Sequence, residues 1–424
     1  MSGLCLYAGA MPVDDAVISP RALALLQLVL LPGLGSVRAT RLLDAFGGSA
    51  DRVLGSSHAA WCAVPGIGRV TSERARAGIA GLRDSVEAEV ERIAKAGARA
   101  IAIGDPGYPT LLAELPDAPR LLFYRGSFGP VDGMPTRDAY PVAVVGSRRC
   151  TQYGIEQAER FGGVLGRQGL TIVSGGARGI DTASHRGALR SGGRTLVVLG
   201  CGLGKVYPPE NAELFERIVA EGRGAILSEL PMATEPRGEH FPARNRIISG
   251  LSLGVLVIEA GRKSGALITA KMAAEEHGRE VMVVPGRVDS EAIAGSLDLL
   301  KKGGGLLVTE PGDVLELLES PARFAHRGVH AARYGVAQRD APVASSNEDT
   351  QSVSAGDASG DDGQVLAAML IEKGGREPLT FDEIVRVSGW SAARVRPALT
   401  LMELSGRVRR VGGRFSCSVT DPQG

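Results

Sequence analysis

Residues 141–181 read PVAVVGSRRCTQYGIEQAERFGGVLGRQGLTIVSGGARGID. Two apolar runs rich in β-branched residues, Val142–Val145 and Thr171–Ser174, flank a segment with helical spacing, Gln157–Arg167. Strands joined in parallel need a crossover connection, which is usually a helix. A strand, a helix and a second strand in this order are therefore typical of a parallel sheet. The stretch predicts an α/β fold.

The same alternation continues to about residue 320. Further strands are predicted at Thr195–Leu199, Ala225–Leu227, Val255–Ile258, Val281–Val284 and Leu306–Val308, with helices that include Ala183–Arg190 and Ala266–His277. Strands that are apolar along their whole length, rather than at every second residue, indicate a sheet covered on both faces. We therefore predict a central domain over residues 101–320.

Residues 1–100 form a predicted helical domain with two similar turns. Leu31–Gly35 and Val64–Gly68 both read apolar-Pro-Gly-apolar-Gly, and helical segments follow them. This pattern is typical of a helix-hairpin-helix pair. Such turns leave backbone N–H groups at a helix start, where a phosphate can bind. A packing role without DNA contact is the alternative.

The C-terminal part consists of a predicted linker and a small domain. Residues 321–363 lose periodicity, and Ser345–Asp362 is rich in Ser, Asp and Gly, which indicates a flexible linker. In residues 364–424, two β-rich segments, Val408–Val411 and Phe415–Ser418, flank a Gly-Gly pair like a β-wing. We predict a winged helix-turn-helix domain, although Pro397 within its third helix departs from that pattern.

Composition limits the classes of function. The formal net charge is +1, so a nucleic-acid site would have to be a local basic patch. The five cysteines, Cys5, Cys62, Cys150, Cys201 and Cys417, are widely spaced and lack a CxxC pair, which favours a reducing compartment over disulfides or zinc. No apolar run is long enough for a bilayer. We expect a cytoplasmic protein without a membrane partner.

The candidate site lies at the carboxyl edge of the predicted sheet, where parallel α/β folds bind ligands. Glycines there would let backbone N–H groups approach a phosphate, and six cations would attract it. About half of the six are expected to contact ligand. We predict that Asp181 caps its helix, and leave open whether Phe241 stacks on a base or packs beneath its loop. The candidates are Gly146, Ser147, Arg148 and Arg149 after the first strand, Ser174, Gly175, Gly176, Arg178 and Gly179 after the second, Phe241, Arg244, Asn245 and Arg246 in a long excursion after the fourth, and Lys263 and Ser264 after the fifth.

Enzyme motifs are incomplete, so we predict no catalytic residue, metal or cofactor. A dinucleotide fingerprint would need glycine at Ser174 and an acid after the next strand, where Gly200-Cys201-Gly202 stands. Pro285–Glu291 departs from the PGGxGTxxE segment of nucleotide-cleaving phosphoribohydrolases. His185 is predicted to lie on a helix surface rather than to act as a base. A phosphoribohydrolase and a winged-helix transcription factor remain the alternatives.

An ordered series of motifs identifies a resemblance. Val142–Arg148, Ser174–Asp181, Tyr207-Pro208-Pro209, Ser228–Pro231, Phe241–Leu251, Glu259-Ala260, Ser264-Gly265, Thr269-Ala270 and Val284-Pro285-Gly286 follow one another. The series resembles the DNA processing protein A family (DprA, also called Smf).

The resemblance implies an extended Rossmann-like domain, between a SAM-like helical domain and a winged helix. It also implies a non-enzymatic homodimer that binds and protects single-stranded DNA and loads RecA recombinase in natural transformation. By the same resemblance, Arg148 grips phosphate, the glycines after the second strand shape their loop, and Phe241, Arg244 and Arg246 line the path of the strand.

Overall fold

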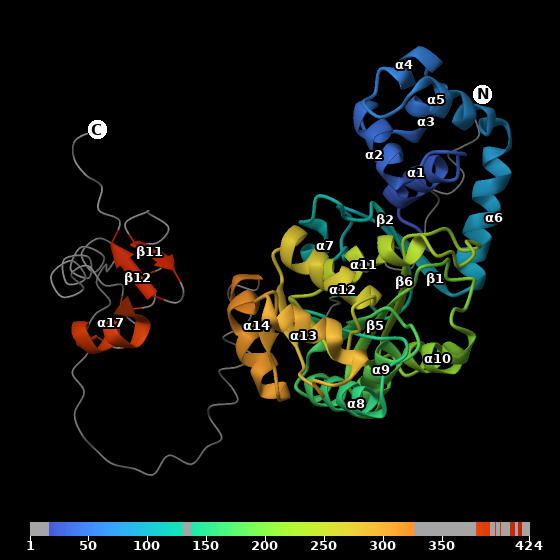
Figure 1. Cartoon of the computed structure of the whole chain (residues 1–424). Coiled ribbons are helices and arrows are strands. Elements are labelled where there is room, and N and C mark those ends of the chain that lie inside the picture. Colours follow the sequence, from blue (N-terminus) through green and yellow to red (C-terminus); the bar gives the residue numbers. More distant parts are fainter. Residues whose placement is uncertain are drawn as a thin grey trace, which may run out of the picture. The chain divides into compact units, whose positions relative to one another are not determined.

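The computed structural model describes residues 17–129, 137–325 and 379–390, residues 395 and 399, and residues 408–411 and 414–417. The chain divides into two units, residues 1–341 and 342–424 (Figure 1). Each unit is considered by itself. Within the described part of the chain, no helix combines the length and apolar character needed to cross a membrane.

A nine-stranded sheet organises the first unit, in the order β1-β2-β6-β5-β4-β3-β7-β8-β9. All seven strands predicted from the sequence are confirmed, and β3 to β9 are mutually parallel. β1 and β2 were not predicted, and they extend the sheet as antiparallel strands beyond β6. The strands are β1 (Ala98–Ala102), β2 (Leu121–Gly126), β3 (Pro141–Val145), β4 (Thr171–Ser174), β5 (Arg194–Val198), β6 (Gly224–Ser228), β7 (Gly254–Val257), β8 (Glu280–Val283) and β9 (Leu306–Leu307).

Helices cover both faces of this sheet, as the apolar strands predicted. Alternate side chains of each strand point to opposite faces, so Val142 and Val144 join a core with α8 and α14, while Ala143 and Val145 join one with α11 and α12. The helices are α7 (Thr110–Ala113), α8 (Gln152–Arg167), α9 (Ile180–Arg190), α10 (Ala212–Ala220), α11 (His240–Gly250), α12 (Gly265–Lys271), α13 (Ala294–Lys301) and α14 (Pro311–Ala325).

The order of the strands reverses at β3. β3 pairs with β4 on one side and with β7 on the other. The chain therefore moves outward from β3 in both directions, which makes β3 the point where the strand order reverses. In open α/β sheets, ligands bind at the carboxyl ends of the strands beside such a point. The loops after β3, β4 and β7 meet there.

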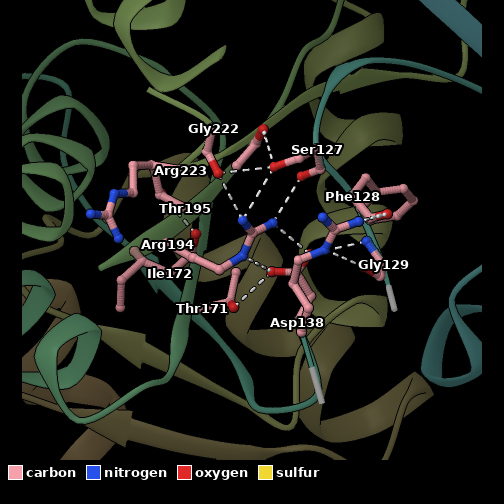
Figure 2. Close-up of polar contacts among 12 residues, drawn as sticks. Ser127, Phe128, Gly129, Asp138, Thr171, Ile172, Arg194, Thr195, Gly222 and Arg223 are labelled. Carbon is pink, nitrogen blue, oxygen red and sulfur yellow. Dashed lines mark hydrogen bonds and ion pairs between the residues drawn. The ribbon is translucent and has the colours of Figure 1, made fainter. Parts of the chain in front are cut away.

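A polar network fastens the opposite, amino-terminal edge (Figure 2). Arg194, the first residue of β5, donates from Nε and Nη2 to the two carboxylate oxygens of Asp138, at 2.8 and 2.9 Å. The same guanidinium donates to Ser127 O at 2.8 Å and to Gly222 O at 3.1 Å. Asp138 Oδ2 also accepts from Gly129 N at 3.0 Å. The network thus ties the chain on both sides of residues 130–136 to the sheet.

The helices of residues 20–95 pack on one end of the sheet. Leu26, Trp61 and Ile93 share a core with Leu121 and Phe123 of β2. In both predicted hairpin turns the first glycine has a left-handed backbone, with φ of 82° at Gly33 and 84° at Gly66. The helices are α1 (Pro20–Val29), α2 (Ser36–Ala45), α3 (Ala50–Gly55), α4 (His58–Cys62), α5 (Arg69–Ala77) and α6 (Leu82–Lys95).

The second unit contains the predicted wing. β11 (Val408–Val411) and β12 (Arg414–Cys417) pair in antiparallel fashion, and β10 (Leu379–Thr380) adds a third strand beside β12. α17 (Phe381–Ser388) ends in a turn at Gly389, where φ is 66°. These elements agree with the predicted winged helix. Pro397 and most of the predicted 321–363 linker lie outside the described residues.

Candidate functional site

The loops after β3, β4 and β7 are fastened to one another. Ser147 N donates to Glu259 O at 2.7 Å, and Ile180 N donates to Ser147 O at 3.3 Å. Gly179 has a φ of 79°, and a Cβ there would overlap Ser147 O. Only glycine permits both this backbone and this approach. The loops carrying Gly146–Arg149, Gly175–Gly179 and Lys263–Ser264 therefore form one continuous rim, as predicted.

Arg244 is a buried strut of this rim. It was predicted in a loop, but Phe241 to Arg246 lie in the first turns of α11, so that part of the prediction is wrong. Its guanidinium donates to Gly175 O at 2.7 Å and to Val198 O, which joins α11 to the ends of β4 and β5. Burial lowers the pKa of Arg244 to about 10, so the group stays charged at neutral pH.

Gly175 makes room for this strut. A Cβ at Gly175 would come within 2.6 Å of Arg244 Nη2. The hydroxyl of Ser174 donates to Val144 O at 2.6 Å and is buried in the sheet. Asn245 accepts from Arg244 Nε at 3.3 Å. These predicted site residues support the rim from within.

Asp181 and Asn211 form hydrogen bonds to the main chain of the loop after β4. Asp181 Oδ2 accepts from the N–H groups of Gly175 and Ala177 at 3.2 Å each. The predicted helix cap is wrong, because α9 begins after Gly179 without a side-chain cap. Asn211 Nδ2 donates to Gly176 O at 2.9 Å. Asn211 is not among the predicted site residues, because no local sequence pattern links it to the distant residue Gly176.

Two of the six predicted cations form ion pairs with carboxylates, and three others are exposed without one in the described part of the chain. Arg178 pairs with Glu210 at 2.6 Å, and Arg246 pairs with Glu229. Arg148, Arg149 and Lys263 are exposed, and within the described residues none has an ion pair with a carboxylate. With Arg244 buried, three of the six cations on this rim remain available to a ligand.

Glu259 does not neutralise them. Its carboxylate oxygens accept from Thr151 N at 2.7 Å and from Thr151 Oγ1 at 2.9 Å, so the charge faces the start of α8. Ser264 Oγ accepts from Ala266 N at 3.3 Å and caps α12. Both groups stabilise helix starts around the rim.

Phe241 is half-buried and lies beside the exposed Arg148. Its ring packs against Gly200, where a Cβ would come within 2.8 Å of Cδ1, and its centroid is 5.6 Å from that of Tyr207. The guanidinium carbon of Arg148 lies 5.0 Å from the Phe241 ring centroid. An aromatic surface and a free cation thus lie side by side, an arrangement that suits a base and its phosphate.

His185 has a structural role. It was predicted on a helix surface, but it is fully buried, with Nδ1 2.6 Å from Thr195 Oγ1. Burial lowers the pKa of His185 to about 3, which keeps the ring neutral. Among the residues that the structure describes, no group of three or more His, Cys, Asp and Glu side chains is arranged to hold a metal ion.

Comparisons with known proteins give the relatives of the chain. It is 46% identical over 207 residues to Protein Smf of Synechocystis sp., covering 49% of this chain and 50% of that protein. It is 39% identical over 237 residues to Protein Smf of Escherichia coli, covering 56% of this chain and 61% of that protein. The chain thus spans about half to three fifths of the length of these relatives.

Structure and family profiles agree with these relatives. The X-ray structure of DNA processing protein A (DprA) from Streptococcus pneumoniae superposes with a TM-score of 0.55 at 33% identity, over 71% of this chain and 98% of that one. Residues 349–414 match the DprA winged helix domain. Residues 99–319, more than half of the chain, match the family profile of DNA recombination-mediator protein A, and the chain belongs to that family.

Proposed function

We propose that this chain binds single-stranded DNA along the carboxyl edge of its sheet, without cleaving it. The observation that carries the proposal is the rim itself, where exposed Arg148, Arg149 and Lys263 have no carboxylate partner in the described chain. Phosphates attract such cations, and several cations in a row suit a polymer backbone better than a single nucleotide.

The aromatic group favours a single strand. Phe241 is half-buried against Gly200 and Tyr207, so its position is fixed before a ligand arrives. Bases in a duplex are already stacked on one another, whereas unpaired bases are free to stack on a protein ring. We infer that a base contacts Phe241 while the neighbouring phosphate contacts Arg148.

Arg244 and Arg246 receive positioning roles in this proposal. Arg244 is buried and hydrogen-bonded to two main-chain oxygens, and Arg246 is paired with Glu229, so neither guanidinium is available to a phosphate. Gly175 and Gly176 are buried and shape the loop after β4, and Gly179, which is half-buried, lets this loop lie close to the loop after β3.

Family membership supports a place for this binding in recombination. We propose that the bound strand is shielded from nucleases and passed to a recombinase of the RecA type, in the cytoplasm, by a homodimer of this chain. Coating by protein would protect the strand, and no step of this transfer requires bond cleavage by the chain.

Direct binding tests the proposal. Labelled single-stranded oligonucleotide is titrated with wild type, with the double variant Arg148→Gln/Arg149→Gln, and with the matched control Arg190→Gln/Arg217→Gln, which removes two exposed arginines elsewhere. We expect weaker binding only in the first variant. Equal binding by all three proteins would show that the rim is not the site.

A further inference from the structure

The two hairpins in the N-terminal helices share one sequence pattern. Residues 31–43 read LPGLGSVRATRLL and residues 64–76 read VPGIGRVTSERAR, without a gap between equivalent positions. In both copies the first and fourth residues are buried, and the proline and both glycines are exposed. Similar local sequences have thus formed similar exposed turns.

The copies contact each other reciprocally. Arg41 of the first hairpin donates to Pro65 O in the turn of the second at 3.2 Å, and its Nη1 occupies the space that a Cβ on Gly66 would need. The equivalent residue of the second hairpin is Arg74, whose Cδ lies 3.6 Å from a Cβ built on Gly33 of the first. Each arginine therefore reaches across to the other turn, which indicates an approximate twofold axis between the hairpins.

This paired surface is locally basic. Residues 31–77 contain six arginines against three acidic residues, a formal charge of 6 − 3 = +3, compared with +1 for the whole chain. Glu73 is occupied by Arg69 at 2.7 Å. Arg38 and Arg41 donate to the main-chain oxygens of Gly33 and Pro65, which leaves their charge uncompensated.

Exposed apolar and amide groups complete the surface at equivalent positions. Val37 is 57% exposed and Val70 is 77% exposed, each at the second residue of its helix. The residues before these helices, Gly35 and Gly68, provide no side-chain cap, so first-turn N–H groups have no such partner. A ligand with two equivalent anionic groups could contact the helix start and the exposed valine of both hairpins at the same time.

We propose that the paired hairpins, residues 31–77, hold double-stranded DNA, with one backbone on each turn. The two strands of a duplex are related by twofold axes perpendicular to the helix axis, and DNA-binding proteins match such axes with their own. A single strand offers no second backbone in the required orientation. This surface is separate from the rim proposed for single-stranded DNA.

A duplex titration of the full chain tests the proposal. The variant Arg41→Gln/Arg74→Gln removes one equivalent cation from each hairpin, and Arg190→Gln/Arg217→Gln is again the matched control. Loss of two phosphate contacts should make the plot of log affinity against log salt less steep by about 1.8, at about 0.9 for each contact. Binding of a single-stranded oligonucleotide should not change.

Two further measurements keep the result interpretable. Thermal melting checks that the variant is folded, and Arg41→Lys/Arg74→Lys, which keeps both charges, should restore most of the salt dependence. An unchanged duplex affinity and slope in the glutamine variant would overturn the proposal, as would the absence of duplex binding by wild type. An equal loss for single strands would also overturn it, because the surface would then serve that ligand.

Discussion

The division of the rim cations into free and paired groups predicts the salt dependence of single-strand binding. Each phosphate contact on a single strand contributes a slope of about −0.7 to log affinity against log salt. Replacing Arg148, Arg149 and Lys263 with glutamine should therefore make the slope less steep by about 2.1, at about 0.7 for each of three contacts. If all six predicted cations contacted phosphate, the three replacements would remove only half of the salt dependence of the rim.

Fluorescence anisotropy with a labelled oligonucleotide, repeated over a series of salt concentrations, measures this slope. The companion variant Arg178→Gln removes a cation that already pairs with Glu210 at 2.6 Å, and should leave the slope within error of wild type. The change in slope, rather than its total, isolates the rim from other basic surfaces. A triple variant with the wild-type slope, or an Arg178 variant with a slope change of about 0.7, would refute the reasoning.

Three further predictions concern stability. Arg194→Ala should lower the free energy of unfolding by about 3–5 kcal/mol, because it leaves the carboxylate of Asp138 buried without its cationic partner. Urea denaturation would measure this loss, and a loss below about 1 kcal/mol would mean that the network is solvated. The folded-state pKa of His185, about 3, lies below its unfolded value, so stability should be lost as the pH falls below about 6.5, by about 2 kcal/mol at pH 5. Urea denaturation of His185→Gln should lack this loss between neutral pH and about pH 5, and a pH profile identical to that of wild type would contradict the prediction. Gly175→Ala should lower the free energy of unfolding by about 1–3 kcal/mol, because its Cβ displaces Arg244, whereas Gly238→Ala, with open space around it, should lower it much less. Equal melting temperatures of the two variants would show that Arg244 does not support the loops.

The parallel strands could be predicted from the sequence because burial on both faces leaves a continuous apolar run. β1 lacks this signal, since Ala98–Ala102 is mostly alanine and includes an exposed arginine. α11 was missed for a different reason. Pro242 lies in its first turn, where the missing N–H has no helical partner anyway, and Glu239 gives no side-chain cap. The stretch therefore has the composition of a loop and the structure of a helix.

The positions of the site loops could be predicted from the sequence, but which of their cations form ion pairs could not. Topology alone brings the ends of β3, β4 and β7 to one edge. The carboxylate partners of the arginines come from other parts of the chain, such as Glu210 for Arg178 and Glu229 for Arg246. No local sequence pattern predicts these pairs. Sequence spacing therefore identified the six cations of the rim, and only packing separates the three that are free.

The electrostatics of the rim explain how a chain of net charge +1 can keep a positive edge. Burial lowers the pKa of Arg244, and Asp181 opposes this effect. Arg148 lowers this pKa further, because the two cations repel each other. Two further acids at the rim, Asp181 and Glu259, direct their oxygens at main-chain N–H groups behind the loops. Negative charge thus stabilises the loops without lying in front of Arg148. An approaching phosphate meets the uncompensated side of this arrangement, and its binding would relieve the repulsion between the two arginines.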